Sequence, residues 1–451
     1  MGVWSTSSEA MMATCAQVVG TANVCPVDQI TATWQSAIAR AVTPNQAIAG
    51  LVFPTTQAEL AAIVTCAHQH QWRILPCGAG SKLDWGGLVG EPQATESPMI
   101  AISTDRLNRL IDHAVGDLTV TVEAGMKFAD LQARLAQAGQ FLAIDPAFPD
   151  QATIGGIVAT ADTGSLRQRY ASVRDMLLGI SFVRADGQLA KAGGRVVKNV
   201  AGYDLMKLFT GSYGTLGVIS QVTFRVYPLP EASQTVILSG TAAAIAQATQ
   251  TLLSSVLTPT SCDLVAGSVA QELAIAGEIG LLVRFQGLRS SVLQQVERVI
   301  EVGKALGLHH TAQVETSELA LWQQLREQMT IASRDQAITC KIGVCTSAAG
   351  MFLQQLPGLG LSAWSVQIHA ASGLGRLTLA APDLPMSTLL KIRSLCQATN
   401  GFLSILQAPV SCKQQVDVWG YAGNALEMMQ RIKQQFDPNP LLSPHRFVGG
   451  I

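Results

Sequence analysis

Charged residues are scarce in this sequence, at 14% of its 451 positions, and their signs almost cancel to a net charge of −1. No basic run with interleaved aromatic residues occurs, so the chain offers no positive field to attract nucleic acid. Hydrophobic residues make up 48% of the chain, which favours a large buried core and argues against disorder. The low charge also leaves apolar surface to be covered, which favours a partner protein.

Long apolar runs are absent too, and none reaches the roughly eighteen residues of a membrane span, so we predict at most a peripheral association with a membrane. No Lys or Arg precedes Arg40, and because a secretory signal begins with basic residues, we expect no such signal. The nine cysteines are scattered. Their closest pair, Cys340 and Cys345, has no second pair or histidine at metal-binding spacing. We therefore predict a reduced, cytoplasmic chain without a metal site.

Glycine is plentiful, with 40 residues, and three clusters of it adjoin strand-like segments. Residues without a bulky side chain let backbone N–H groups approach a phosphate to about 3 Å, so such loops bind a pyrophosphate without cations. Each cluster taken singly is also consistent with an ordinary turn, but three together favour a phosphate-containing cofactor. The first lacks the spacing of a Rossmann unit, which argues against NAD. The clusters are GAGS (78–81), TIGG (153–156) and GSYGTLG (211–217).

Composition and periodicity divide the chain into three segments. Residues 1–45 are predicted to form an N-terminal helical segment, and residues 46–230 a domain that ends at a proline pair. Residues 231–451 are predicted to be an α+β domain of alternating strands and helices. The apolar spacing predicts helices over 57–70, 128–137, 241–253, 292–306 and 425–436, and strands over 73–76, 118–122, 177–183, 218–226 and 281–285.

Six ordered blocks resemble FAD-linked oxidases of the vanillyl-alcohol oxidase/PCMH type. The resemblance covers about residues 46–230, and the tail FDPNP (436–440) with PHRF (444–447) is similar to the usual C-terminus of that family. It implies an α+β fold: a PCMH-type FAD-binding domain of two α+β subdomains, followed by an α+β FAD-linked oxidase-like cap domain. The blocks are PCGAGSK (76–82), TVEAG (121–125), ATIGG (152–156), RYASVRD (169–175), KNVAGYDL (198–205) and GSYGTLGVI (211–219).

The resemblance also implies which residues bind FAD. The first glycine loop would wrap the pyrophosphate, the second cluster would line the middle of the cofactor, and the last would face the adenine side. Some family members attach the flavin through a histidine in the first loop. Ser81 occupies about that place here, so we predict non-covalent FAD. The implied cofactor-binding residues are Cys77, Gly78, Ala79, Gly80, Ser81, Lys82, Pro146, Thr153, Gly155, Gly156, Thr163, Gly164, Ser165, Gly217, Val218 and Ile219.

Within this type, the chain resembles the FAD-binding E subunits of bacterial glycolate oxidase (glycolate dehydrogenase). The motif KNVAGYD (198–204) points there, as does Tyr213, where the larger D-lactate and glycolate dehydrogenase subunits usually carry a glutamate. The resemblance implies a bacterial flavoprotein that oxidises glycolate, a 2-hydroxy acid, to glyoxylate. Its implied partners are a larger FAD-binding subunit and an iron–sulfur subunit, because this chain has no iron–sulfur cysteine pattern.

Oxidation of a 2-hydroxy acid needs a base for the hydroxyl proton, a cation for the carboxylate and a hydride acceptor. The catalytic relatives use a stretch of the form H-x-G-D-G-N-x-H near a metal. The similar text here, HAASGLGR from His369 to Arg376, lacks the acidic residue and the second histidine, so we predict no metal. His369 is interpreted as a catalytic base, a binding residue or a structural histidine. Arg376 is interpreted as a carboxylate-binding group or a salt-bridge partner.

Two alternatives to the glycolate oxidase subunit therefore remain. One is a self-sufficient FAD-dependent 2-hydroxy-acid (D-lactate-like) or alcohol dehydrogenase of the same fold. The other is a non-catalytic scaffold subunit, since the signature from His369 to Arg376 is incomplete.

Overall fold

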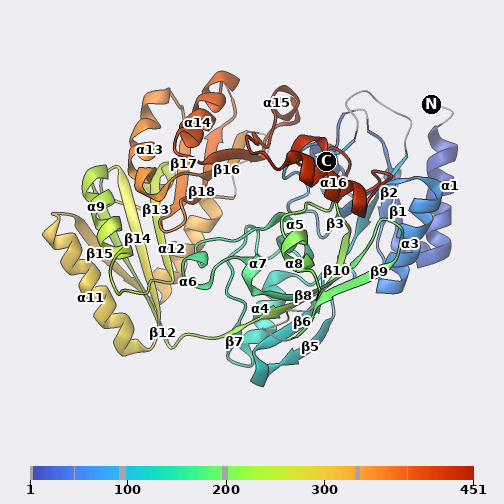
Figure 1. Ribbon diagram of the computed structural model, residues 1–451. Coiled ribbons are helices and arrows are strands. Elements are labelled where there is room, and N and C mark those ends of the chain that lie inside the picture. The colour runs from blue at the N-terminus through green and yellow to red at the C-terminus, as the bar shows by residue number, and fades with distance from the viewer. Residues whose placement is uncertain (1–3, 45, 91–97, 196–201, 331–335, 383) are drawn as a thin grey trace. The chain divides into compact units, whose positions relative to one another are not determined.

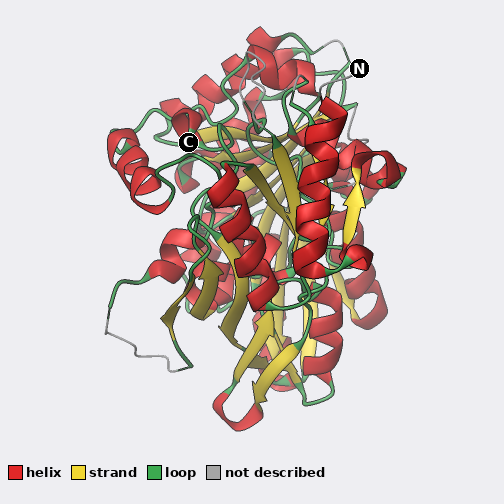
Figure 2. Cartoon of the chain, turned by 90° about the vertical axis from the view of Figure 1, so that its right-hand side faces the viewer, coloured by secondary structure: helices red, strands yellow, loops and turns green. Residues whose placement is uncertain are grey.

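The chain folds into two compact units. The first contains residues 1–163, 172–228 and 422–451, and the second contains residues 164–171 and 229–421. Both units mix helices and strands, which confirms the predicted α+β class (Figures 1 and 2). The computed structural model describes residues 4–44, 46–90, 98–195, 202–330, 336–382 and 384–451.

A four-stranded sheet of order β1-β2-β4-β3 opens the first unit. Strands β2 (Ile48–Val52), β4 (Met99–Ser103) and β3 (Arg73–Cys77) are parallel, and β1 (Val24–Pro26) pairs antiparallel with β2. The N-terminal segment is therefore not helical throughout: β1 lies between α1 (Trp4–Val19) and α2 (Ala32–Ala41) and ties both to the sheet. A strand of three residues that ends in a proline is too short to show alternating hydrophobicity, so it is not predictable from the sequence.

Helix α3 (Gln57–His70) connects β2 to β3 and confirms the predicted helix over 57–70. Its start is set by Thr56, whose hydroxyl accepts a hydrogen bond from the amide of Glu59 at 3.1 Å, an N-cap that satisfies one of the free amides of the first turn. Its apolar side is fully buried and includes Leu60 and Ile63. The helix thus leads into β3, and the first glycine loop follows directly after that strand.

A five-stranded antiparallel sheet of order β5-β6-β10-β8-β9 completes the framework of this unit. The predicted strands over 118–122, 177–183 and 218–226 are confirmed to within one residue. Its strands are β5 (Leu110–Ala114), β6 (Thr119–Glu123), β8 (Leu177–Val183), β9 (Leu189–Gly193) and β10 (Val218–Arg225), accompanied by α4 (Phe128–Ala136), α5 (Ile154–Thr160), α7 (Val173–Met176), α8 (Leu205–Phe209) and the short pair β7 (Gln140–Phe141) and β11 (Tyr227–Pro228).

The C-terminal residues return to the first unit instead of staying with the predicted 231–451 domain. After helix α16 (Leu426–Phe436), Leu442 forms a parallel bridge with Ile74 of β3. The amide of Ile74 donates to the carbonyl of Leu441 at 2.7 Å, and the amide of Ser443 donates to the carbonyl of Ile74 at 2.9 Å. Figure 1 shows this red tail close to the blue strands. The tail therefore extends the edge of the first sheet.

The second unit is built on one eight-stranded antiparallel sheet of order β15-β12-β14-β13-β17-β18-β16-β19. Its strands are β12 (Ala232–Gly240), β13 (Ser261–Gly267), β14 (Ile279–Gly287), β15 (His309–Val314), β16 (Ala337–Gly343), β17 (Trp364–His369), β18 (Leu374–Ala380) and β19 (Phe402–Gln407). Its helices are α6 (Arg167–Tyr170), α9 (Ala242–Leu253), α10 (Ser268–Glu272), α11 (Arg289–Ala305), α12 (Glu315–Gln328), α13 (Ala349–Gln355), α14 (Met386–Ala398) and α15 (Val410–Gln415).

The two faces of this sheet differ in polarity. Alternate residues such as Cys262, Leu264 and Ile368 form a large apolar core with α9, α11, α13 and α14. The opposite face carries a smaller apolar cluster under α10 and α12. Because successive side chains of a strand point to opposite faces, Asp263 and His369 belong to this second face. It is the face that carries the polar residues discussed below.

No helix in the described ranges is both long enough and apolar enough to cross a membrane.

Candidate functional site

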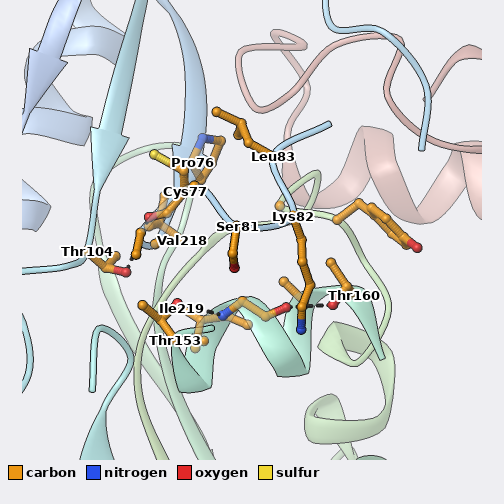
Figure 3. Close-up of a pocket in the computed structure, with 18 of the residues that line it drawn as sticks. Pro76, Cys77, Ser81, Lys82, Leu83, Thr104, Thr153, Thr160, Val218 and Ile219 are labelled. Atoms are coloured by element: carbon orange, nitrogen blue, oxygen red, sulfur yellow. Dashed lines mark hydrogen bonds between the residues drawn. The ribbon is translucent and has the colours of Figure 1, made fainter. Parts of the chain in front are cut away.

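The three predicted glycine clusters meet around one pocket of the first unit (Figure 3). Figure 3 shows Ser81 and Lys82 extending from the first loop toward the segment that carries Thr153 and Thr160. The predicted residues that line the pocket are Cys77, Gly78, Ala79, Gly80, Ser81, Lys82, Thr153, Gly155, Gly156, Gly217, Val218 and Ile219. The other four, Pro146, Thr163, Gly164 and Ser165, are not among its lining residues.

Glycine is required where the loops touch one another. A Cβ atom on Gly78 would lie 2.0 Å from the hydroxyl oxygen of Thr153, and one on Gly155 would lie 2.8 Å from the Cβ of Ala124. The amide of Gly155 also donates to the carbonyl of Ala124 at 2.7 Å. The backbones therefore pack against each other without side chains between them, which leaves a cradle of main-chain groups suited to a phosphate-containing ligand.

A buried ion pair joins the first loop to the segment before Thr163. The ammonium of Lys82 lies 2.6 Å from the carboxylate of Asp162, and both side chains are less than 5% exposed. The same carboxylate accepts a hydrogen bond from the amide of Ala147 at 2.8 Å, which fixes the chain next to the predicted Pro146. The positive charge of Lys82 is thus largely neutralised within the protein, and the pocket depends mainly on backbone groups.

Thr104 was not predicted from the sequence to line the pocket, and Tyr213 and Gly214 belong to the predicted third cluster without having been assigned to the cofactor individually. Thr104 follows β4, and its amide donates to the carbonyl of Cys77 at 2.9 Å, a position set by the parallel pairing of β3 and β4. Tyr213 lines the pocket with a positive φ of 54°, a conformation that is uncommon for a non-glycine residue. Gly214, beside it, has φ 76°. The third loop therefore turns sharply as it enters the pocket.

Arg446 of the C-terminal tail also lines the pocket and is buried. Its guanidinium donates hydrogen bonds to the carbonyl oxygens of Leu83 and Trp85, the latter at 2.9 Å. Burial lowers the pKa of this guanidinium to about 10, so the group remains cationic at neutral pH. The tail thereby holds the chain that leaves the first glycine loop.

Lys433 of α16 holds the third glycine loop by hydrogen bonds in the same way. Its ammonium donates to the carbonyl of Thr215 and to that of Leu442, both at 2.9 Å, and lies 2.5 Å from the carboxylate of Asp437. Burial lowers the pKa of Lys433, and the neighbouring Asp437 opposes this shift. The spacing of the glycine clusters contained no signal for either tail contact.

The second cluster of predicted residues lies on the polar face of the eight-stranded sheet. His369 is 7% exposed, and its Nδ1 lies 2.7 Å from a carboxylate oxygen of Asp263, which is fully buried. The side-chain amide of Gln367 donates to the other oxygen of Asp263 at 2.8 Å and to the hydroxyl of Ser165 at 2.9 Å. Ser165 and His369 are thus connected through two residues that the sequence did not single out.

Arg376 lies on the neighbouring strand of the same face, paired across the sheet with Gln367 on one side and with Lys341 on the other. The remaining predicted residues have local roles. The hydroxyl of Thr163 accepts from the amide of Val173 at 3.2 Å, and the carbonyl of Gly164 accepts from the amide of Arg167 at 3.3 Å. Residues 198–201 of the KNVAGYD motif lie outside the described residues.

All nine cysteines are unpaired thiols. Burial raises the pKa of Cys77, which lines the pocket, and of Cys340 to about 12. Within the described ranges, no group of three or more His, Cys, Asp or Glu side chains is placed to hold a metal ion.

Cys345 is expected to be the first thiol to react with a disulfide reagent. It alone among the nine cysteines is exposed, and a hydrogen bond with Ser347 lowers its pKa, which increases the share of reactive thiolate. The fast phase of absorbance change should correspond to one thiol per chain and should vanish in Cys345→Ser. A fast phase that persists in that variant would contradict the expectation; Cys412→Ser, which changes a thiol of raised pKa, is the matched control.

Residues 48–193 match the family described as FAD binding domain. This segment contains the first two glycine clusters of the pocket, and the cofactor of the chain is FAD, as the sequence predicts. The fold is similar to that of p-cresol methylhydroxylase with substrate bound, with a TM-score of 0.72 and 15% identity over 97% of this chain and 96% of that one. The PCMH-type fold is therefore confirmed across both units.

Two curated relatives are similar in sequence. The chain is 27% identical to glycolate oxidase subunit GlcD of Bacillus subtilis over 296 residues, which cover 63% of this chain and 62% of that protein. It is 39% identical to glycolate oxidase subunit GlcE of Escherichia coli over 125 residues, or 28% of this chain and 36% of that protein. Both matches cover less than two thirds of the relative's own length.

Proposed function

We propose that this chain is the FAD-binding subunit of a glycolate oxidase/dehydrogenase complex of the bacterial type, oxidising glycolate to glyoxylate. The observation that carries the proposal is the convergence of the three glycine loops on one pocket of the first unit. The similarity to GlcE, at 39% identity over 125 residues, supports the choice of subunit. The proposed partners are a larger FAD-binding subunit and an iron–sulfur subunit, and nine unpaired thiols suit a reducing cytoplasm.

In this proposal, the backbone amides from Gly78 to Lys82 hold the FAD pyrophosphate, and the turn at Gly155 and Gly156 lines the middle of the cofactor. Gly217, Val218 and Ile219 face its adenine side. Bound FAD supplies a two-electron acceptor for the hydride of the substrate. Ser81 lines the pocket and takes about the place of the histidine that links the flavin in some proteins of the resembled type, so in this proposal the cofactor is held without a covalent bond.

The substrate side of the proposal rests on the polar face of the eight-stranded sheet. His369 takes the hydroxyl proton, and Arg376, on the adjoining strand, binds the carboxylate of the 2-hydroxy acid. These two groups on one face also favour the second candidate, a self-sufficient 2-hydroxy-acid dehydrogenase, because base and cation then come from the same chain.

Absorbance spectra test the proposal. The protein purified with its partner subunits is expected to be yellow, to lose its flavin band when glycolate is added without oxygen, and to release flavin on acid precipitation. The chain alone is expected to keep its flavin band in glycolate and in D-lactate, because in this proposal the partner subunits are needed to complete the substrate site. Bleaching of the isolated chain would favour the self-sufficient dehydrogenase instead. A colourless protein, or a complex unaffected by either acid, would contradict the proposal and favour a scaffold.

A further inference from the structure

Asp263 is the centre of the polar cluster on the eight-stranded sheet. It lies on β13 directly opposite His369 of β17 in the antiparallel register. A fully buried carboxylate is costly unless its oxygens are hydrogen-bonded. Here one oxygen is bonded to His369 and the other to Gln367. The cluster is therefore satisfied at every oxygen of the carboxylate.

The chemistry of this contact determines the tautomer of His369. An ionised carboxylate only accepts hydrogen bonds, so the Nδ1 atom at 2.7 Å must carry a proton and donate it. In the neutral ring the unprotonated nitrogen is then Nε2. Among the described residues nothing is bonded to Nε2, and the side chain keeps 9% exposure while that of Asp263 has none. The ring is thus held at Nδ1 by the buried Asp263, and its Nε2 is left as a proton acceptor.

We propose that Asp263 is a positioning residue that holds His369 with its proton on Nδ1, so that Nε2 accepts the hydroxyl proton of the 2-hydroxy acid. This inference rests on the proposed function. In this step the O–H bond of the substrate would break with its proton going to Nε2, and the C–O bond would become a carbonyl; bound FAD would supply the acceptor for the hydride of the adjacent C–H bond. Asp263 keeps its charge throughout and stabilises the imidazolium that forms.

Gln367 extends the same support toward the loop of Ser165. One amide nitrogen donates to both Asp263 and Ser165, so the carboxylate is clamped between the amide and the imidazole. The Gln367 nitrogen that faces Asp263 can only donate a hydrogen bond, so the side-chain atom at position 263 that faces it must be an acceptor. Asp263→Asn therefore introduces a conflict: if its oxygen faces Gln367, its amide faces His369 and forces the ring to accept at Nδ1.

Nitrogen NMR of the flavin-loaded protein with 15N-labelled histidine tests the assignment directly. His369 in its neutral form is expected to show a protonated Nδ1 and an unprotonated Nε2. Its signals are identified by their loss in His369→Gln. In Asp263→Asn the proton is expected to move to Nε2, and the rate of flavin reduction by glycolate in the complex should fall by about 100- to 10,000-fold, with FAD content unchanged.

Glu318→Gln is the matched control, because Glu318 is another buried carboxylate facing this sheet, bonded to Arg284 at 2.8 Å. It should leave the His369 tautomer and the reduction rate near those of the unchanged protein. A proton on Nε2 in the unchanged protein would overturn the proposal, as would a tautomer shift in Asp263→Asn without a slower reduction. If no 2-hydroxy acid reduces the flavin, the proposed function fails, while the tautomer still decides the role of Asp263 toward His369.

Discussion

Replacing Gly78 by alanine is expected to weaken FAD binding roughly ten- to hundredfold. The new Cβ atom would lie 2.0 Å from the hydroxyl oxygen of Thr153 and 2.9 Å from its Cβ and Cγ2 atoms. Rotating the threonine cannot relieve the clash, because its Cβ is fixed to the backbone. The two loops must therefore move apart, and overpacking of this kind costs about 1–3 kcal/mol, which converts to that loss of affinity.

The displacement acts on the pocket itself, since Gly78 and Thr153 both line it. Thr153 also caps α5 by accepting from the amide of Gly156 at 3.3 Å, so its movement disturbs the second glycine cluster as well. The measurement is a fluorescence titration of the flavin-free protein with FAD. Gly116→Ala is the control, because no atom lies within 4 Å of the added Cβ, and it should bind FAD normally. Equal affinities of the two variants would show that the loops tolerate separation.

The sequence predicts much of the first unit because local signals there agree with tertiary contacts. The largely apolar segment LLGISFV (177–183) becomes β8, buried along its whole length. The helix over 57–70 has both a capping threonine and a regular apolar side. In the second unit, by contrast, β12 (Ala232–Gly240) was not predicted, although it pairs on both sides. The sequence of β12, ASQTVILSG, mixes polar and apolar residues without the strict alternation that would predict a strand.

The pocket loops were found from the sequence because clustered glycines next to strand-like segments are typical of loops whose backbone approaches a ligand closely. The groups that support them were not, since they come from distant parts of the chain. Asp263 reaches His369 across 106 positions, through a strand pairing that no local spacing specifies. Arg446 and Lys433 reach the glycine loops from the tail. Side chains that act through long-range register are not predictable from one sequence.

Replacing Lys433 by methionine is expected to destabilise the folded protein by about 3–5 kcal/mol, a large part of an ordinary stability of about 5–15 kcal/mol. Lys433 is 7% exposed, and Asp437, its partner, is 2% exposed. Methionine fills a similar volume but leaves the buried carboxylate without its cation, and the carbonyl of Thr215 loses its donor. Asp437 retains hydrogen bonds from the amides of Leu441 and Leu442, so its charge stays buried and incompletely compensated.

Urea unfolding of the flavin-loaded protein measures this loss, and the same helix supplies the control. Arg431 forms an ion pair with Glu427, but both side chains are at least 70% exposed, so Arg431→Met should change the free energy of unfolding by less than about 0.5 kcal/mol. Adding Asp437→Asn to Lys433→Met removes the uncompensated charge and should recover part of the loss. A Lys433→Met protein as stable as Arg431→Met would mean that the tail contact at Thr215 contributes nothing to the fold. If the contact does contribute, the weakened third loop should also release FAD at lower urea than the control, because Thr215 lies between Tyr213 and Gly217, which both line the pocket.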